Sequence, residues 1–116
     1  MYRVMKRDGE VAGFNLSKIS VAIEKAFQAQ NREYNQDIID LLALKVTADF
    51  EPKVKDSLIQ VEDVQDSEEN ILIKAGYADV AKGYILYRKQ REKIRNLKST
   101  MLDYKEIVDS YVKVTD

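Results

Sequence analysis

Two short segments rich in apolar residues open the chain, and the polar residues between them predict a β-hairpin. The expected strands are residues 2–7 and 10–14, joined by an Asp8-Gly9 turn. Asp-Gly is the strongest short-range hairpin signal because both residues tolerate the positive φ angles of a type I′ turn. Residues 57–61 are a third short strand, which we expect to join the hairpin as an edge.

Apolar residues recur at three- and four-residue spacing in the next part of the chain, which predicts two amphipathic helices. The first begins at an Asn15 or Ser17 cap and ends near residue 29. The second begins at an Asn35 cap and ends before Pro52, the only proline, because the residue preceding a proline is pushed out of the helical region. The apolar faces consist of Ile19, Ala22, Ile23, Ala26 and Phe27 in the first helix, and of Ile38, Ile39, Leu41, Leu42, Val46 and Phe50 in the second.

The C-terminal half of the chain is predicted to be helical. A third helix starts after Val61, which is expected at the N-cap, and opens with two acidic residues that suit a first turn. Gly76 is placed to end it in the left-handed conformation. A long helix follows over about residues 79–98, and residues 101–112 add a further amphipathic turn or two. The apolar positions of the helix over residues 79–98 are Val80, Tyr84, Ile85, Tyr87 and Ile94.

Together these elements define an α+β fold, in which a small antiparallel sheet of two or three strands packs on four or more helices. A chain of 116 residues with 45% apolar and 34% charged residues is typical of one globular domain. The longest apolar run, residues 38–44, is interrupted by Asp40 and is too short to span a bilayer. The first residues lack the apolar segment of a signal peptide. We therefore expect a cytoplasmic protein with no membrane partner.

The residue types that are absent exclude several kinds of chemistry. Without cysteine or histidine, the chain cannot form a zinc finger, an iron–sulfur site, a cysteine nucleophile or a Ser-His-Asp triad. Acidic residues are numerous, but none lies in a sequence context that indicates burial. A net charge of −1 argues against nucleic-acid binding, which usually requires a clearly basic domain. We expect no catalytic residue and no metal-ligating residue in this chain.

Cations gather around the predicted hairpin and the start of the first helix. Lys6 and Arg7 precede the turn, Asn15 stands at the helix start, and Lys18 lies in the first helical turn. A cation in a first turn opposes the helix dipole unless an anion is present, and N–H groups at a helix N-terminus bind phosphates. The cluster is either a charged surface turn or a site for an anion with several phosphates.

Two further segments also allow both a structural and a functional interpretation. Residues 59–66 are a strand entering an acidic first turn, or a helix edge that presents the Gln65 amide to a base or ribose. Residues 87–98 form a basic helix end that complements its own dipole, or one that directs Lys89 toward phosphates at the hairpin. Nucleic-acid contact is a third interpretation, disfavoured because only Tyr87 offers a surface for base stacking.

Four ordered blocks of the sequence carry a family resemblance. They are Val-Met-Lys-Arg-Asp-Gly at 4–9, Phe14 to Ile19, Val-Glu-Asp-Val-Gln-Asp at 61–66, and Gly-Tyr-Ala-Asp-Val-Ala-Lys-Gly-Tyr-Ile-Leu-Tyr-Arg at 76–88. Together they resemble the ATP-cone, a nucleotide-binding regulatory domain found at the N-terminus of ribonucleotide reductases and in a bacterial repressor of their genes. The resemblance implies a nucleotide-binding domain over residues 1–92. Residues 93–116 resemble the helical segment that leads into the catalytic domain of anaerobic (glycyl-radical, class III) ribonucleoside-triphosphate reductases.

The resemblance implies a regulatory function and a set of contacts. The family binds ATP or dATP, with Mg²⁺ expected on the triphosphate; ATP permits turnover and dATP suppresses it, commonly by changing oligomeric association. Contacts with the nucleotide, its phosphates or its sugar are implied for Val4, Lys6, Arg7, Asn15, Lys18, Ile19 and Lys89, and contacts with the base for Val61 and Gln65. The implied partners are adenine nucleotides, the catalytic domain of the reductase and a second copy of the chain.

The sequence departs from the family pattern at three places. Ala12 replaces the acidic residue that some members place near the sugar, Val61 and Gln65 replace a threonine and a histidine of some aerobic members, and residues 67–70 are unusually polar. These departures leave open a degenerate ATP-cone that serves as a protein-interaction module. A nucleotide-responsive transcriptional regulator is a further alternative, although the family's repressor carries a cysteine zinc ribbon and this chain has no cysteine.

Overall fold

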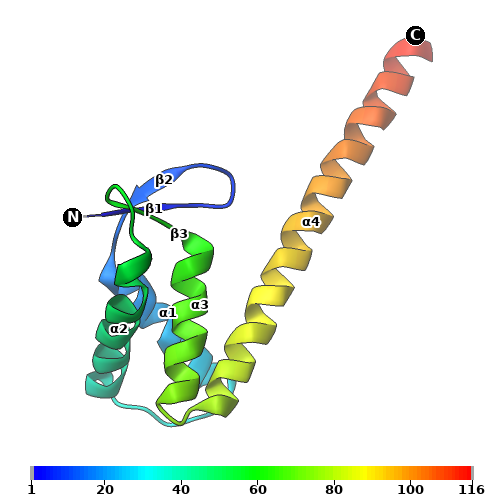
Figure 1. Ribbon diagram of the computed structural model, residues 1–116. Coiled ribbons are helices and arrows are strands. Elements are labelled where there is room, and N and C mark those ends of the chain that lie inside the picture. The colour runs from blue at the N-terminus through cyan, green and yellow to red at the C-terminus, as the bar shows by residue number, and fades with distance from the viewer. Residues whose placement is uncertain (1, 116) are drawn as a thin grey trace. The chain divides into compact units, whose positions relative to one another are not determined.

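The computed structural model describes residues 2–115, and the side chains of residues 2–98, in an α+β arrangement (Figure 1). Its elements are β1 (Arg3–Met5), β2 (Val11–Gly13), α1 (Leu16–Ala29), α2 (Gln36–Phe50), the 3₁₀-helix η1 (Glu51–Lys53), β3 (Leu58–Gln60), α3 (Val61–Lys74) and α4 (Ala78–Thr115). The chain divides into two units, Met1–Ile85 and Leu86–Asp116, which are described separately below. The predicted α+β class is confirmed.

The sheet has the strand order β2-β1-β3 and is mixed. Strands β1 and β2 are antiparallel, with Met5 opposite Val11, whereas β1 and β3 are parallel, with Val4 opposite Ile59. The third strand therefore exists where we predicted it, but its expected antiparallel orientation is wrong. The connection from β1 to β3 includes α1 and α2, and such a long crossover is what a parallel pair requires.

The hairpin turn also differs from the expected type I′ geometry. The Gly9 N–H donates to the Lys6 carbonyl over 3.0 Å, so the four-residue turn is 6–9 rather than one centred on Asp8-Gly9. Gly9 has a φ of 90°, and Asp8 is not among the described residues with positive φ. A three-residue loop that ends in a left-handed glycine satisfies the same strand pairing.

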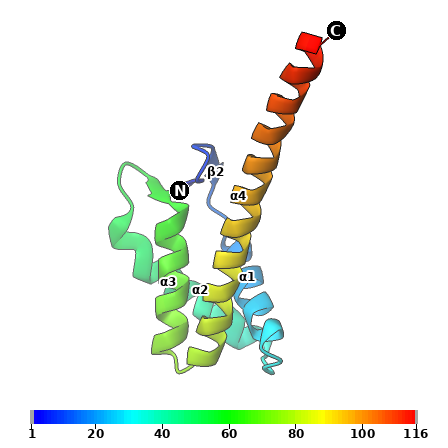
Figure 2. The ribbon, with the colours of Figure 1, turned by 90° about the vertical axis from the view of Figure 1, so that its right-hand side faces the viewer.

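The helices of the first unit pack into one core below the sheet. Figures 1 and 2 show the hairpin and the N-terminus of α3 at one end of α1, α2 and α3, and the α1–α2 loop at the other end. The most deeply buried large side chains include Ile23, Phe27, Ile39, Phe50 and Leu72. Tyr2 and Phe14 pack edge-to-face with Phe50, with ring centroids 5.9 and 5.8 Å away, which fixes the hairpin to α2.

The predicted core faces are confirmed in most positions. In α2, however, Leu41 is 52% exposed and Ala43 is buried instead. Asp40 is the only polar residue among residues 38–44, so the spacing of the apolar residues there does not define which face is inward. In α4 Val80 and Tyr84 are buried, whereas Tyr87 and Ile94 are exposed.

The unusually polar segment at residues 67–70 lies partly inside the core. Ser67 and Glu68 of α3 are buried, and the Tyr84 hydroxyl of α4 donates a hydrogen bond to the Glu68 carboxylate. Asn70 donates to Asp49 of α2 over 3.4 Å. These contacts connect α3 to its neighbouring helices through polar groups as well as apolar ones.

The helix ends follow the predicted capping residues with one exception. Asn15 caps α1 and Asn35 caps α2, and Gly76 has a φ of 91° after α3. The N-cap of α3 is Gln60 rather than Val61, and its side chain makes no capping hydrogen bond. Helix α4 continues to Thr115 without the break expected near residue 98. Within the described part of the chain, no helix is both long enough and apolar enough to cross a membrane.

Candidate functional site

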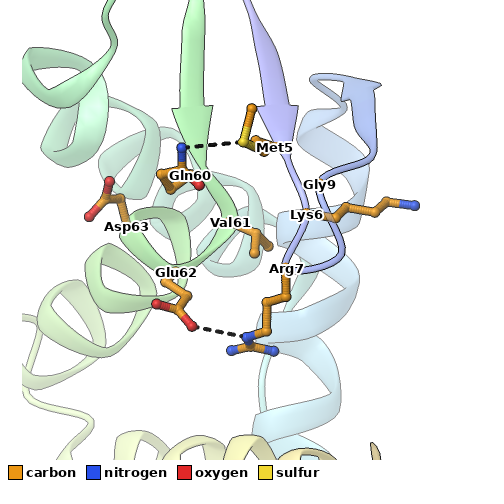
Figure 3. Close-up of a pocket in the computed structure, with 8 residues that line it drawn as sticks. All are labelled: Met5, Lys6, Arg7, Gly9, Gln60, Val61, Glu62 and Asp63. Carbon is orange, nitrogen blue, oxygen red and sulfur yellow. Dashed lines mark hydrogen bonds and ion pairs between the residues drawn. The ribbon is translucent and has the colours of Figure 1, made fainter.

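An open depression of about 420 Å³ lies between the hairpin turn and the N-terminus of α3, and we call it the hairpin pocket (Figure 3). It is lined by Met5, Lys6, Arg7, Gly9, Gln60, Val61, Glu62 and Asp63. One wall comes from the end of β1 and the turn that follows it. The other wall comes from the end of β3 and the first turn of α3.

The parallel pairing of β1 and β3 explains why these two segments meet. Met5 lies opposite Gln60 at the ends of the two strands, and the Gln60 amide nitrogen is 3.5 Å from the Met5 sulfur. Parallel strands end at the same edge of a sheet, so the residues after each strand leave it side by side. The sheet therefore brings Lys6 and Arg7 next to Val61 and the residues that follow it.

Arg7 is the cation that crosses the hairpin pocket. Its Nε donates to Glu62 Oε1 over 3.1 Å and its terminal nitrogen donates to Gln65 Oε1 over 2.7 Å. The Arg7 side chain is 33% exposed. Two of its donors are thus already directed at the first turns of α3, and both acceptors are accessible to solvent.

Lys6 makes a weaker internal contact. Its ammonium is 4.0 Å from Glu10 Oε2 across the hairpin, and its side chain is 49% exposed. Figure 3 shows the ammonium extending away from Glu62 and from the Arg7 guanidinium. An exposed pair at this distance contributes little to stability, which leaves Lys6 available to a bound anion.

The start of α3 adds backbone donors to the same place. Because the Gln60 side chain does not cap the helix, the first N–H groups have no side-chain acceptor from the N-cap. Glu62 and Asp63 in the first turn offset the positive end of the helix dipole. The hairpin pocket therefore combines a guanidinium, an ammonium, a helix N-terminus and two carboxylates.

The residues predicted around the start of α1 do not line the hairpin pocket. Asn15 Oδ1 accepts hydrogen bonds from the Ser17 N–H (3.0 Å) and the Ser17 hydroxyl (2.6 Å), so Asn15 serves as a helix cap. Lys18 is exposed and forms no ion pair with the described side chains. Ile19 is a core residue, 3% exposed, and Val4 is half-buried in the central strand.

Lys89 lies on α4 in the second unit, Leu86–Asp116, whereas the hairpin pocket belongs to the first. Its participation in a phosphate site stays a prediction. Of the predicted site residues, Lys6, Arg7 and Val61 line one pocket, and Gln65 reaches it through its hydrogen bond with Arg7.

Five of the lining residues were not predicted as site residues. Met5, Gly9 and Gln60 belong to strand ends or the turn, and Glu62 and Asp63 were interpreted as first-turn residues only. The parallel register is the signal that places them there, and it is not visible in local sequence patterns.

A second depression of about 620 Å³ adjoins the pocket, shares Gln60 and Asp63 with it, and contains Lys53 and Lys55.

Comparison with known proteins identifies the family. The fold is that of a small α+β domain with a pocket between its hairpin and α3, and the family model of the ATP cone domain matches residues 2–93. The chain therefore belongs to the ATP cone domain family.

Two relatives illustrate the similarity to whole enzymes. The chain is 37% identical over 101 residues to the ribonucleoside-diphosphate reductase subunit alpha of Chlamydia muridarum, a match that covers 80% of this chain and 10% of that protein. It is 40% identical over 103 residues to the vitamin B12-dependent ribonucleoside-diphosphate reductase of Thermoplasma acidophilum, covering 84% of this chain and 13% of that protein. The chain thus spans about a tenth of the length of these relatives.

Proposed function

We propose that this domain binds ATP or dATP as an effector and regulates the overall activity of a ribonucleotide reductase. The observation that carries the proposal is the hairpin pocket of an ATP cone domain, in which Lys6 and Arg7 line the wall opposite the uncapped N-terminus of α3 and Arg7 reaches across to it. Guanidinium, ammonium and helix N–H groups are the donors that polyphosphates prefer.

The other predicted contacts extend this site toward the whole nucleotide. The Val4 backbone meets the nucleotide beside Lys6 and Arg7. Asn15 and Lys18 supply polar contacts from the start of α1, with Ile19 packing nearby, and Lys89 adds a cation from α4. Val61 and Gln65 face the base. Mg²⁺ accompanies the triphosphate, and among the described residues no group of three or more carboxylates is arranged to hold a metal by itself.

The domain acts on a catalytic domain rather than performing the reduction. Radical reduction of ribonucleotides uses a cysteine thiyl, and the chain contains no cysteine. The catalytic domain and a second copy of the chain are therefore the proposed protein partners, and the cytoplasm is the proposed location.

The reductase type is a finer part of the proposal. The resemblance of residues 93–116 supports an anaerobic ribonucleoside-triphosphate reductase. The two relatives described above are diphosphate reductases, and they support the alternative that the substrate is a diphosphate. Assaying the full-length enzyme with CTP and with CDP, with and without oxygen, distinguishes the two types.

Calorimetric titration with ATP, dATP and GTP tests nucleotide binding, and a sizing column run with each nucleotide tests the change of oligomeric state. Saturable binding of ATP or dATP supports the effector function. Absence of heat and of a thermal shift with both would favour a protein-interaction module that keeps the fold without the ligand.

A further inference from the structure

The guanidinium of Arg7 already has an anionic partner in the hairpin pocket. Glu62 Oε1 accepts from Nε over 3.1 Å, and Gln65 Oε1 accepts from a terminal nitrogen over 2.7 Å. The partners lie 55 and 58 positions away in the sequence, so the contact connects the hairpin to α3.

A carboxylate and a phosphate compete for the same donors of an arginine. Both are anions that accept charge-assisted N–H···O bonds in the plane of the guanidinium. Glu62 is 63% exposed and sits on the rim of the pocket, so it can turn into solvent when a phosphate replaces it. The Arg7–Glu62 ion pair is exposed to solvent, and breaking an exposed ion pair costs little free energy.

We propose that Glu62 is an affinity-determining residue that occupies on Arg7 the place of a nucleotide phosphate. This inference rests on the proposed nucleotide site and assigns a function to a residue for which sequence reasoning gave only a first-turn role. Binding of a triphosphate exchanges the Glu62 carboxylate for a phosphate oxygen on Arg7. Removing the negative charge of Glu62 therefore tightens binding of any polyphosphate that reaches this pocket.

Asp63 provides a matched control for this substitution. It is the next residue of the same first turn, it lines the same pocket and it carries the same charge. The hydrogen bonds of Arg7 to described side chains go to Glu62 and Gln65, and not to Asp63. Asp63→Asn thus removes the same charge from the same helical turn and leaves the partner of Arg7 in place.

The test compares the dissociation constants of ATP and of inorganic tripolyphosphate for the wild-type chain, Glu62→Gln and Asp63→Asn at fixed ionic strength. We expect Glu62→Gln to bind both probes about two- to fivefold more tightly than Asp63→Asn does, which corresponds to the loss of one exposed ion pair. Thermal melts of the three proteins verify that each is folded.

A double-mutant cycle shows whether the effect passes through Arg7. In an Arg7→Gln background there is no guanidinium to compete for, so Glu62→Gln and Asp63→Asn should change the affinity for tripolyphosphate equally. If Glu62→Gln and Asp63→Asn bind tripolyphosphate equally well when Arg7 is present, and ATP still binds, the inference about Glu62 is overturned and the proposed function is not. Failure of the wild-type chain to bind ATP or dATP at all would instead overturn the proposed function.

Discussion

Asn15 has two proposed functions, as a helix cap and as a nucleotide contact, and a second asparagine allows them to be separated. Asn15 Oδ1 accepts from the Ser17 N–H over 3.0 Å, and Asn35 Oδ1 accepts from the Ile38 N–H over 2.9 Å. Both residues cap a long helix of the first unit. Only Asn15 belongs to the proposed nucleotide site, so Asn35→Ala is the control for Asn15→Ala.

Each alanine substitution removes one capping acceptor and should cost about 1 kcal/mol of unfolding free energy. For a domain of about 60–100 residues, this lowers Tm by about 4–8 °C. ATP at about 100 times its Kd should stabilise the wild-type domain and Asn35→Ala by about 2.7 kcal/mol each. A ligand hydrogen bond lost in Asn15→Ala weakens ATP binding by about 0.5–1.5 kcal/mol, so the stabilisation by ATP should be smaller by that amount.

Asn15→Asp tests the same distinction in the opposite direction. Aspartate caps a helix as well as asparagine does, so the stability without nucleotide should be retained. Its carboxylate, however, repels a phosphate and lacks the amide donors, so the affinity for ATP should fall by at least as much as in Asn15→Ala.

Urea denaturation and thermal melts with and without ATP measure both quantities. Equal stabilisation by ATP in Asn15→Ala and Asn35→Ala would show that Asn15 does not contact the nucleotide. Unchanged stability of both variants without ATP would refute the capping argument itself.

Three further predictions concern the packing, the ion pairs and the uncapped helix. Phe50→Ala removes a fully buried ring and should cost about 3–5 kcal/mol in urea denaturation, whereas Leu41→Ala, at a position 52% exposed, should stay within about 0.5 kcal/mol; a similar loss for both would contradict the core described above. The hydrogen bond from Arg32 holds the pKa of Asp79 below its ordinary value, so this pair stabilises the fold above about pH 4 and its contribution disappears as the pH falls through the folded-state pKa. The stability difference between the wild-type chain and Arg32→Gln should therefore shrink on acidification, and a difference independent of pH would refute this assignment. Gln60→Ser gives α3 a capping hydroxyl and should raise the unfolding free energy by about 0.5–1 kcal/mol; a loss of stability would indicate that the Gln60 contact with Met5 matters more than the cap.

Features that depend on neighbouring residues could be predicted from the sequence. The Asn15 and Asn35 caps and the left-handed Gly76 each follow from interactions within one helical turn. The α+β class follows from the same local signals together with the spacing of apolar residues. The amphipathic face of α1 was predicted because its polar positions are regular. The face of α2 was partly wrong because Asp40 is the only polar residue in the apolar run that contains Leu41.

Features that depend on long-range pairing could not be predicted in the same way. The parallel register of β1 and β3 places Met5 beside Gln60, and nothing in either strand specifies that partner. The contact of Arg7 with Glu62 follows from the register and joins residues 55 positions apart. The sequence therefore indicated two cations of the proposed anion site, Lys6 and Arg7, whereas the opposite wall of the hairpin pocket required the structure.

Calorimetric titration of ATP and dATP into the wild-type chain and into Lys6→Ala/Arg7→Ala is the most direct test of nucleotide sensing at the hairpin pocket. Lys53→Ala/Lys55→Ala is the control, because it removes the same number of cations from the adjoining depression. We predict low-micromolar or tighter binding of ATP or dATP to the wild-type chain and to the control, and loss of binding in Lys6→Ala/Arg7→Ala. Undiminished binding in Lys6→Ala/Arg7→Ala, or no binding by the wild-type chain, would contradict the account.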